Sequence, residues 1–246
     1  MIITSCDNPK VTEVVKLADK KYRKAFSRYV IEGARLVADA VKYGAEIAAV
    51  YVSESAANDY AYANQTVVSD RVFAKMSDTV NSQGILAVVD KPAQDCRLPN
   101  GNCLVLDGLQ DPGNVGTLLR TAVACGFGDV YAVNCVDIYS PKVLRSAMSA
   151  HFCLSLHESG NLAEVFERLD EYDIVACDMD GESAFKRKFG GKIALVLGNE
   201  GNGLSDYSKT HADSVVSLPM ANGFESLNVA VAGSVIMYQV FSQSLK

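Results

Sequence analysis

Apolar residues along the chain follow two spacings, one typical of buried strands and one typical of amphipathic helices. Continuous apolar runs occur at 47–52, 85–89, 103–106 and 193–197, as in strands that are buried on both faces. Between these runs, apolar residues recur at three- and four-residue intervals, as in helices that cover a sheet. The alternation predicts an α/β protein whose second half contains a largely parallel sheet.

The expected elements form two series. Residues 91–102 contain two prolines and a glycine without apolar periodicity, which predicts a linker between domains at 1–90 and 103–246. In the first series we expect helices at 8–27, between Gly33 and Gly44, and at 71–77, with strands at 29–33, 47–52, 66–68 and 85–89. In the second we expect strands at 103–106, 130–133, 153–156, 174–177, 193–197 and 213–218, with helices at 117–126, 141–150, 162–169 and 227–243.

Three strand-to-helix junctions of the second series are rich in glycine and polar residues. They lie at 107–116, 198–205 and 218–228. Ligands of parallel α/β sheets bind beyond the carboxyl ends of the strands, and glycine lets the backbone approach a ligand closely. We therefore expect the three loops to form one pocket at that edge of the sheet. The first loop also opens a helix, whose amides can receive an anion.

Polar side chains in and after these loops are candidates for chemistry, although each has a simpler structural explanation. Arg120 lies on the polar face of a predicted helix, where a surface ion pair would also explain it. Asn114 is in a position typical of a helix cap, and Ser226 and Asn228 stand where the last helix needs one. A helix cap explains only one of Ser226 and Asn228. Glu200 is a carboxylate among glycines.

Charge is unevenly distributed along the chain. The overall net charge is -6, yet the segment 10–35 contains eight basic and three acidic residues, interleaved with aromatic residues. Such a segment is a candidate for gripping a phosphate backbone, although a solvated helix face has the same composition. The candidate contacts to such a backbone are Lys20, Lys21, Arg23, Lys24 and Arg28.

Composition argues against several other classes of protein. The seven cysteines are scattered without a Cys-x-x-Cys pair, and the chain has three histidines, so we expect neither a metal site nor a disulfide framework. The sequence has no apolar run near the ~20 residues that cross a bilayer. Its first ten residues lack the pattern of a signal peptide. We therefore expect a cytoplasmic protein with reduced thiols.

Three ordered motifs carry a family resemblance. Residues 111–122, 195–205 and 218–232 are similar to the three motifs of the SpoU family. Members of this family are S-adenosylmethionine-dependent RNA ribose 2′-O-methyltransferases. The first series also resembles the substrate-binding module of that family, in residues 30–41 and 83–89. The resemblance spans essentially all of 103–246, with the three motifs in order, and parts of the first series.

The resemblance implies a small N-terminal α/β domain that binds RNA and a C-terminal α/β domain with a trefoil knot. It implies S-adenosylmethionine as the cofactor, no metal, and a homodimer formed through the C-terminal domain. The extra first domain favours 23S rRNA over tRNA as the substrate. By position, the catalytic set is Arg120, Asn114, Glu200, Ser226 and Asn228, and the methyl-donor contacts are Leu197, Gly198, Gly203, Leu218, Met220 and Leu227.

Arg120 is the central catalytic residue that this resemblance implies. A guanidinium is protonated at ordinary pH, so it suits phosphate binding and stabilisation of charge on the 2′-oxygen better than general-base work. The sequence leaves both roles open. Alternatives are a tRNA 2′-O-methyltransferase and a non-catalytic RNA-binding or assembly factor on the same fold. A dinucleotide-dependent oxidoreductase is disfavoured because no Gly-x-Gly-x-x-Gly follows the first strand.

Overall fold

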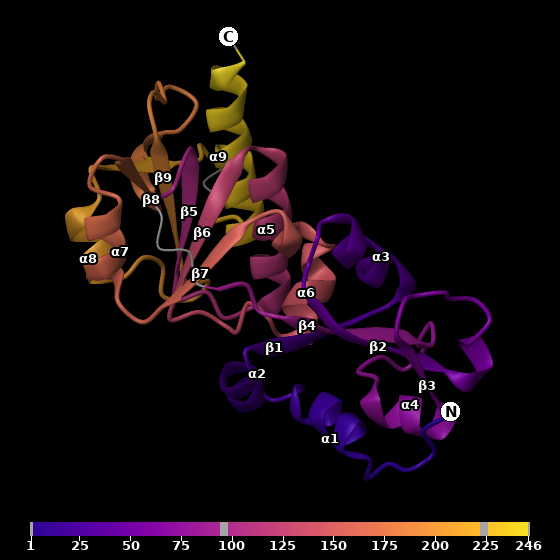
Figure 1. Ribbon diagram of the computed structural model, residues 1–246. Helices are drawn as coiled ribbons and strands as arrows, with labels where there is room; N and C mark the ends of the chain where they lie inside the picture. Colours follow the sequence, from indigo (N-terminus) through magenta and orange to yellow (C-terminus); the bar gives the residue numbers. More distant parts are fainter. Residues whose placement is uncertain (1, 94–97, 222–225, 246) are drawn as a thin grey trace. The chain divides into compact units, whose positions relative to one another are not determined.

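The computed structural model describes residues 2–93, 98–221 and 226–245, and the chain divides into two compact units. One unit comprises Met1–Ala93 with Tyr139–Leu144, and the other comprises Gln94–Ile138 with Arg145–Lys246. Figure 1 traces the elements of each. Part of the linker expected at 91–102 lies outside the described residues, and Asn102 already begins a strand of the second unit.

The first unit is built on a four-stranded mixed sheet with the order β1-β4-β2-β3. Strand β4 runs antiparallel to β1 and β2, and β2 runs parallel to β3. Helices α1 and α4 pack on this sheet around a core that includes Val11, Val14 and Phe73. The elements are α1 (Pro9–Lys16), α2 (Lys20–Phe26), β1 (Arg28–Glu32), α3 (Ala34–Lys42), β2 (Ile47–Ser53), η1 (Glu54–Ala56), β3 (Gln65–Val68), α4 (Asp70–Met76) and β4 (Ile85–Asp90).

The single helix expected at 8–27 is two helices, and that prediction was wrong. Helix α1 ends at Lys16, and α2 begins at Lys20 after an N-cap at Asp19. The Asp19 carboxylate accepts a hydrogen bond from the Lys21 amide at 2.8 Å. Val11 and Val14 of α1 are buried in the core, whereas in α2, which the structure describes in full, only Arg23 is buried. The break between the helices is marked by the cap at Asp19, which apolar periodicity alone does not reveal.

The second unit contains a six-stranded sheet with the order β10-β8-β9-β5-β6-β7, and each neighbouring pair is parallel. The parallel α/β architecture predicted for this part of the chain is confirmed, and the central strand β9 is buried along its length. The prediction missed α8. The elements are β5 (Asn102–Asp107), α5 (Pro112–Ala124), β6 (Phe127–Val133), η2 (Ala150–Phe152), β7 (Ser155–Ser159), α7 (Leu162–Arg168), β8 (Asp173–Ser183), β9 (Ile193–Gly198), α8 (Asp206–His211), β10 (Ser214–Ser217) and α9 (Val229–Ser244). Helix α6 (Pro141–Ala147) is divided between the two units after Leu144.

The terminal helix α9 packs against α5 and β9. Gly233 permits a close approach, since a Cβ atom there would lie 2.4 Å from Leu197 Cδ1 and 2.8 Å from Leu118 Cδ2. A hydrogen bond of 2.8 Å joins the hydroxyls of Thr121 on α5 and Ser234 on α9. A small residue on α9 therefore brings the helix that follows the third loop close to the strand that precedes the second.

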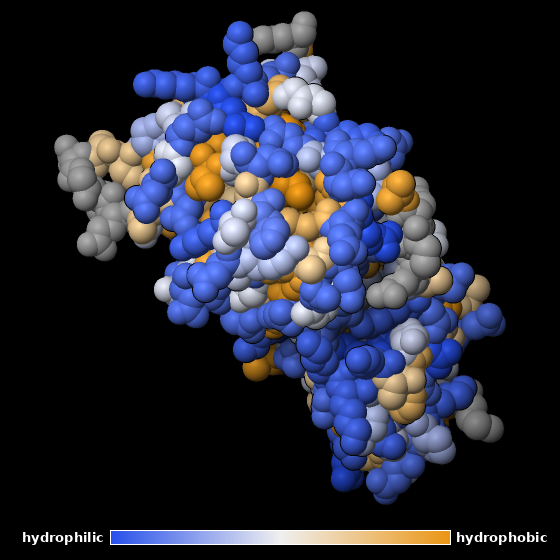
Figure 2. Space-filling view, turned by 90° about the vertical axis from the view of Figure 1, so that its left-hand side faces the viewer, coloured by the Kyte–Doolittle hydropathy of each residue, from blue (hydrophilic) through white to orange (hydrophobic). Residues whose placement is uncertain are grey.

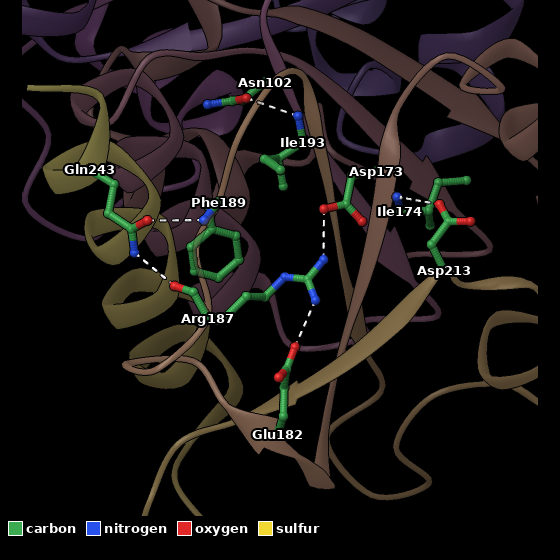
Figure 3. Close-up of polar contacts among 9 residues, drawn as sticks. All are labelled: Asn102, Asp173, Ile174, Glu182, Arg187, Phe189, Ile193, Asp213 and Gln243. Atoms are coloured by element: carbon green, nitrogen blue, oxygen red, sulfur yellow. Dashed lines mark hydrogen bonds and ion pairs between the residues drawn. The ribbon is translucent and has the colours of Figure 1, made fainter. Parts of the chain in front are cut away.

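The far end of α9 is tied to the segment that follows β8, as Figure 3 shows. The Gln243 amide accepts a hydrogen bond from Phe189 N at 2.9 Å and donates one to Arg187 O at 3.0 Å. The Arg187 guanidinium donates to Asp173 Oδ2 and to Glu182 Oε1, both at 2.7 Å. These bonds connect both ends of β8 with the segment after it, and that segment with α9.

The surface is mainly polar on the face drawn in Figure 2, where hydrophobic residues form small separate patches. Among the described residues, no helix combines the length and the apolar character needed to cross a membrane.

Candidate active site

One carboxylate joins the glycine-rich loop after β9 to the loop before α5. Glu200 Oε2 accepts a hydrogen bond from Gln110 N at 3.3 Å, and Oε1 accepts bonds from Asp111 N at 3.2 Å and Asn114 Nδ2 at 3.1 Å. Amides at a helix N-terminus carry partial positive charge. The position for which the sequence predicted a bound anion is therefore taken by a carboxylate of the chain itself.

The protonation of Glu200 follows from these contacts. Burial by itself would raise the pKa of this carboxyl group, but the hydrogen bonds from Asn114 and from the backbone amides of Gln110 and Asp111 hold the pKa below its ordinary value of 4.5. Glu200 is thus ionised at neutral pH. Since both of its oxygens already accept hydrogen bonds from the protein, the residue is suited to positioning the loops.

Asn114 brings the three loops together. Its Nδ2 donates to Glu200 on the second loop, and its Oδ1 accepts a hydrogen bond of 2.9 Å from Asn228 Nδ2 at the end of the third. The three loops are far apart in sequence, and side chains from all of them meet here. The expectation that the loops converge at one edge of the sheet is confirmed by these two bonds.

Helix caps account for part of this arrangement. Asn228 is the N-cap of α9, where its Oδ1 accepts from Ala230 N at 2.9 Å and Val231 N at 3.3 Å. Asn114 is not the cap of α5, contrary to expectation. That cap is Asp111, whose Oδ1 accepts from Asn114 N at 2.8 Å, so α5 begins at Pro112 and includes residues expected in a loop. The side chain of Asn114 is thereby left to the other loops.

Asn199 shapes the glycine-rich loop, and the sequence analysis missed it. Its backbone exchanges two hydrogen bonds with Gly203, from Asn199 N to Gly203 O at 2.8 Å and from Gly203 N to Asn199 O at 2.9 Å. Its side-chain oxygen accepts from Gly201 N at 2.9 Å and Asn202 N at 3.0 Å, and its Nδ2 donates to Gly108 O at 2.7 Å. The available signal was an asparagine within a glycine turn, which readily hydrogen-bonds to nearby backbone.

Gly198 is required by the fold of this loop. A Cβ atom on it would lie 2.4 Å from Gly203 C and from Leu204 N, which are backbone atoms and cannot swing away. Gly203 has a φ of +70°, a conformation that glycine adopts without strain. The loop therefore folds back tightly on the end of β9, and these two glycines serve that reversal whatever else they contact.

Asp107, at the carboxyl end of β5, holds the other end of the loop, and it too was missed. Its side chain is nearly buried, and Oδ2 accepts hydrogen bonds from Ser205 N at 3.0 Å, Ser205 Oγ at 2.7 Å and Ser208 Oγ at 2.7 Å. Ser205 is also the N-cap of α8, accepting from Ser208 N at 3.2 Å. One carboxylate on β5 thus fixes the start of α8. An acidic residue at the end of an apolar strand was the available signal.

Arg120 is exposed on α5 and makes no hydrogen bond or ion pair with any residue that the structure describes. It stands six residues beyond Asn114, about 9 Å along the helix axis. The surface ion pair that would have explained it structurally is not found within the described ranges. The donors of its guanidinium are therefore open to solvent and available to a ligand.

The remaining candidates are placed less completely. Ser226 is exposed and has no hydrogen bond to another described residue, while residues 222–225 of the third loop lie outside the described ranges. Among the expected methyl-donor contacts, Leu197 is buried in β9, Leu218 and Met220 are half-buried after β10, and Leu227 is exposed just before α9. No group of side chains suited to hold a metal ion occurs within the described part of the chain.

One of the expected RNA contacts is corrected by the structure. Arg23 is 4% exposed, and its Nη1 donates to Leu17 O and Ala18 O, both at 2.7 Å. These carbonyls follow α1, where helix ends leave acceptors to be satisfied. Arg23 thus stabilises the turn between α1 and α2 and is not exposed for a phosphate. The structure leaves Lys20, Lys21 and Lys24 exposed, and Arg28 half-buried.

Two family models match this chain, one in the N-terminal part and one in the C-terminal part of the sequence. Residues 101–238 match the SpoU rRNA Methylase family, and residues 8–87 match the MRM3-like substrate binding domain. The first match covers more than half of the chain. It includes all three loops that meet at Asn114.

Individual relatives extend over nearly the whole chain. An uncharacterized tRNA/rRNA methyltransferase of Synechocystis is 32% identical over 98% of this chain and 93% of its own. The 23S rRNA guanosine 2′-O-methyltransferase RlmP of Bacillus subtilis is 30% identical over 97% and 98%. The crystal structure of the SpoU methyltransferase AviRb from Streptomyces viridochromogenes with AdoMet has a TM-score of 0.89 at 24% identity, covering 97% of this chain and 99% of that one. This chain belongs to the SpoU rRNA methylase family.

Proposed function

We propose that this chain transfers the methyl group of S-adenosylmethionine to a ribose 2′-hydroxyl of RNA, with 23S rRNA as the substrate. As a SpoU family member it is an RNA methyltransferase. The observation that supports this specific reaction is the hydrogen-bond network of Asn114, Glu200 and Asn228, which holds the three motif loops together. Arg120 lies on the helix that begins at this network and forms no ion pair with a described residue. The name of the Bacillus subtilis relative supports rRNA over tRNA.

The residues after β10 fit the expected cofactor. The backbone groups of Leu218 and Met220 make no hydrogen bond to another described residue, although both residues are half-buried. These backbone groups are therefore open to a ligand, and a nucleoside offers donors and acceptors for them. The apolar side chains of Leu218, Met220 and Leu227 suit an adenine ring, and Gly198 and Gly203 supply the adjoining turn. When bound, S-adenosylmethionine supplies an activated methyl group on a sulfonium.

The chain's own contribution is alignment and charge stabilisation. The 2′-oxygen must lie in line with the methyl group, and negative charge develops on it as its proton leaves. A guanidinium at Arg120 can bind the neighbouring phosphate in a bidentate manner and stabilise that charge. Asn114 and Asn228 place the first turns of α5 and α9, and Ser226 is assigned to the nucleotide. Glu200 holds the first two loops in register.

The first unit is assigned to RNA binding. Lys20, Lys21 and Lys24 are exposed on α2, and a cluster of exposed cations binds a phosphate backbone in a salt-dependent way. The match of residues 8–87 to a substrate binding domain supports this assignment. A location in the cytoplasm follows if the substrate is bacterial rRNA, as the name of the Bacillus subtilis relative gives for that protein.

Pairing of two copies and a knotted chain complete the proposal. Val231 and Tyr238 stand seven residues apart on α9 and are exposed, as are Leu227 and, on α5, Val123. An apolar stripe of this kind on the helices that flank the site suits a second copy of the chain. The knot is inferred from family membership, and the contact of α9 with β9 at Gly233 is compatible with it.

The proposal is tested with Arg120→Ala and Arg120→Lys in a radiolabelled methyl-transfer assay on rRNA from a strain that lacks the enzyme. Removing a donor that stabilises transition-state charge costs about 10²–10³-fold in turnover. We expect that loss for Arg120→Ala, with S-adenosylmethionine affinity within twofold of the unaltered protein by calorimetry. Near-normal turnover by Arg120→Ala would refute the assignment. Alkali cleaves RNA by attack of a 2′-hydroxyl on the adjoining 3′-phosphodiester, so resistance of that bond at the methylated nucleotide identifies the 2′-hydroxyl as the acceptor.

A further inference from the structure

A hollow of about 640 Å³ lies in the first unit and shares no lining residue with the three-loop network. One wall is a face of α1, and the opposite wall is the junction of α2 and β1. The side chains that line it are Asp7, Pro9, Thr12, Glu13, Lys16, Phe26 and Arg28. Two of them are acidic and two are basic, so the lining has no net charge. It suits a neutral polar ring better than a phosphate.

Local structure explains why these residues face one another. Positions 9, 12, 13 and 16 share one side of a helix, while Val11 and Val14 on its other side are buried in the core. Ser27 has a φ of 51°, a left-handed conformation that lets β1 begin directly after α2 ends. Phe26 and Arg28 are thereby held on either side of a single sharp turn.

The apolar part of the hollow is an exposed aromatic ring. Phe26 is 42% exposed, although a side chain of this size is ordinarily buried. Its ring centroid lies 5.9 Å from that of Tyr22, one turn earlier on α2, and Lys16 Nζ lies 5.5 Å from the Tyr22 ring. Aromatic rings beside a lysine are the usual platform for unstacked bases of single-stranded RNA.

The polar part presents a donor and an acceptor side by side. Arg28 donates from Nη1 to Glu13 Oε1 at 2.8 Å and from Nε to Asp90 Oδ1 at 2.7 Å. Both partners hold the guanidinium in place, and the hydrogen bonds that Arg28 donates to Asp90 and Glu13 raise its pKa. Arg28 Nη2 and Glu13 Oε2 make no hydrogen bond with another described residue. Every nucleobase has an acceptor next to a donor on its pairing edge, which these two atoms complement.

We propose that this hollow binds one unpaired nucleobase of the RNA substrate. The base stacks on Phe26, its pairing edge meets Glu13 and Arg28, and Lys16 contacts the adjoining phosphate. The proposal rests on the proposed function, since it takes RNA as the partner, and it adds selectivity for unpaired over paired RNA. In a duplex the same base is stacked and its pairing edge is occupied, so it cannot enter.

The test measures binding of fluorescein-labelled ten-nucleotide adenosine and uridine RNAs and of a ten-base-pair RNA duplex by fluorescence anisotropy. Stacking on one aromatic side chain changes single-strand affinity at least about fivefold. We expect Phe26→Ala to weaken single-strand binding by that factor or more and duplex binding less than twofold. Phe26→Trp should keep single-strand binding. The matched control is Tyr43→Ala, which removes an aromatic ring that is 45% exposed and also lies beside a lysine, Lys42 at 5.1 Å, outside the hollow.

A second measurement reads the pocket directly. An adenosine decamer with one 2-aminopurine changes its fluorescence when that base stacks on protein, and we expect the change with the unaltered chain and Phe26→Trp but not with Phe26→Ala. Circular dichroism establishes that each variant is folded. Equal losses of single-strand and duplex binding in Phe26→Ala, or no loss in either, would overturn the proposal. If the unaltered chain binds neither RNA, the proposed function itself fails at this step, which is a distinct result.

Discussion

Truncating Asp107 tests whether one carboxylate holds the glycine-rich loop in place. Three donors converge on its Oδ2, namely Ser205 N, Ser205 Oγ and Ser208 Oγ, at 2.7–3.0 Å. Hydrogen bonds to a charged acceptor contribute about 1.5–3 kcal/mol each. Their sum overstates the effect, because the bonds share one atom and removal of the carboxylate also ends the cost of burying a charge.

The residual cost of Asp107→Ala comes from the groups left behind. Ser208 is fully buried, so its hydroxyl cannot turn to water, and an unsatisfied buried donor costs about 1–3 kcal/mol. The Ser205 amide loses its partner as well. We expect Asp107→Ala to lower the free energy of unfolding by about 3 kcal/mol. Asp107→Asn keeps an oxygen for the three donors but buries an amide nitrogen, and we expect a loss of about 1–2 kcal/mol.

Urea denaturation followed by circular dichroism at pH 7 measures these values, and calorimetry with S-adenosylmethionine measures the effect on the loop. We expect weaker cofactor binding in Asp107→Ala than in Asp107→Asn. Asp180→Ala is the control, because Asp180 is exposed in the same unit and should change stability by less than about 0.5 kcal/mol. The reasoning is refuted if Asp107→Ala matches this control, or if Asp107→Asn is as damaging as Asp107→Ala.

Further predictions concern pH, packing and charge. Folding lowers the pKa of Glu200 below 4.5, so its carboxylate stabilises the folded state above that pH. The difference in the free energy of unfolding between the unaltered protein and Glu200→Gln should therefore shrink as the pH falls through the folded-state pKa. Measuring the stability of both proteins over a series of acidic pH values checks this. Gly198→Ala meets backbone atoms at 2.4 Å and should cost about 3 kcal/mol or more, whereas Gly233→Ala meets only leucine methyl groups and should cost about 1 kcal/mol; equal costs in thermal denaturation would contradict this contrast. Lys24→Glu should reduce the salt dependence of RNA affinity with little effect on the free energy of unfolding, as binding curves at several salt concentrations would show. Arg23→Ala should lower the free energy of unfolding by about 2 kcal/mol, which melting curves measure.

The architecture of the second unit could be predicted because buried parallel strands leave an unambiguous pattern. The apolar runs at 103–106 and 193–197 became β5 and β9, the two neighbouring strands at whose ends the site is built. Parallel strands have their carboxyl ends at the same edge of the sheet, so the convergence of the loops that follow them could be predicted from the order of strands and helices along the chain. Helix α8 was missed because only Ser208 of its six residues is buried, which leaves no apolar period to recognise.

Boundaries and partners were harder to predict, because they depend on contacts between distant residues. The break between α1 and α2 depends on Asp19 and on the buried guanidinium of Arg23. The same arginine looks like an RNA contact in the sequence, where its charge is visible and its burial is not. Asp107 and Asn199 are ordinary polar residues until their partners are known, and those partners include residues 91 to 101 positions away.

The sequence by itself determined the fold class, the family and the identity of the three loops, because period, glycine content and motif order are local properties of the chain. Only the tertiary structure decided what each side chain in those loops does. Glu200 fills the anion position before α5, Asp111 caps that helix in place of Asn114, and Arg120 stays unpaired among the described residues. The physical reason is that hydrogen bonding and burial depend on which residues the sheet brings together, and that pairing is set by packing across the whole unit.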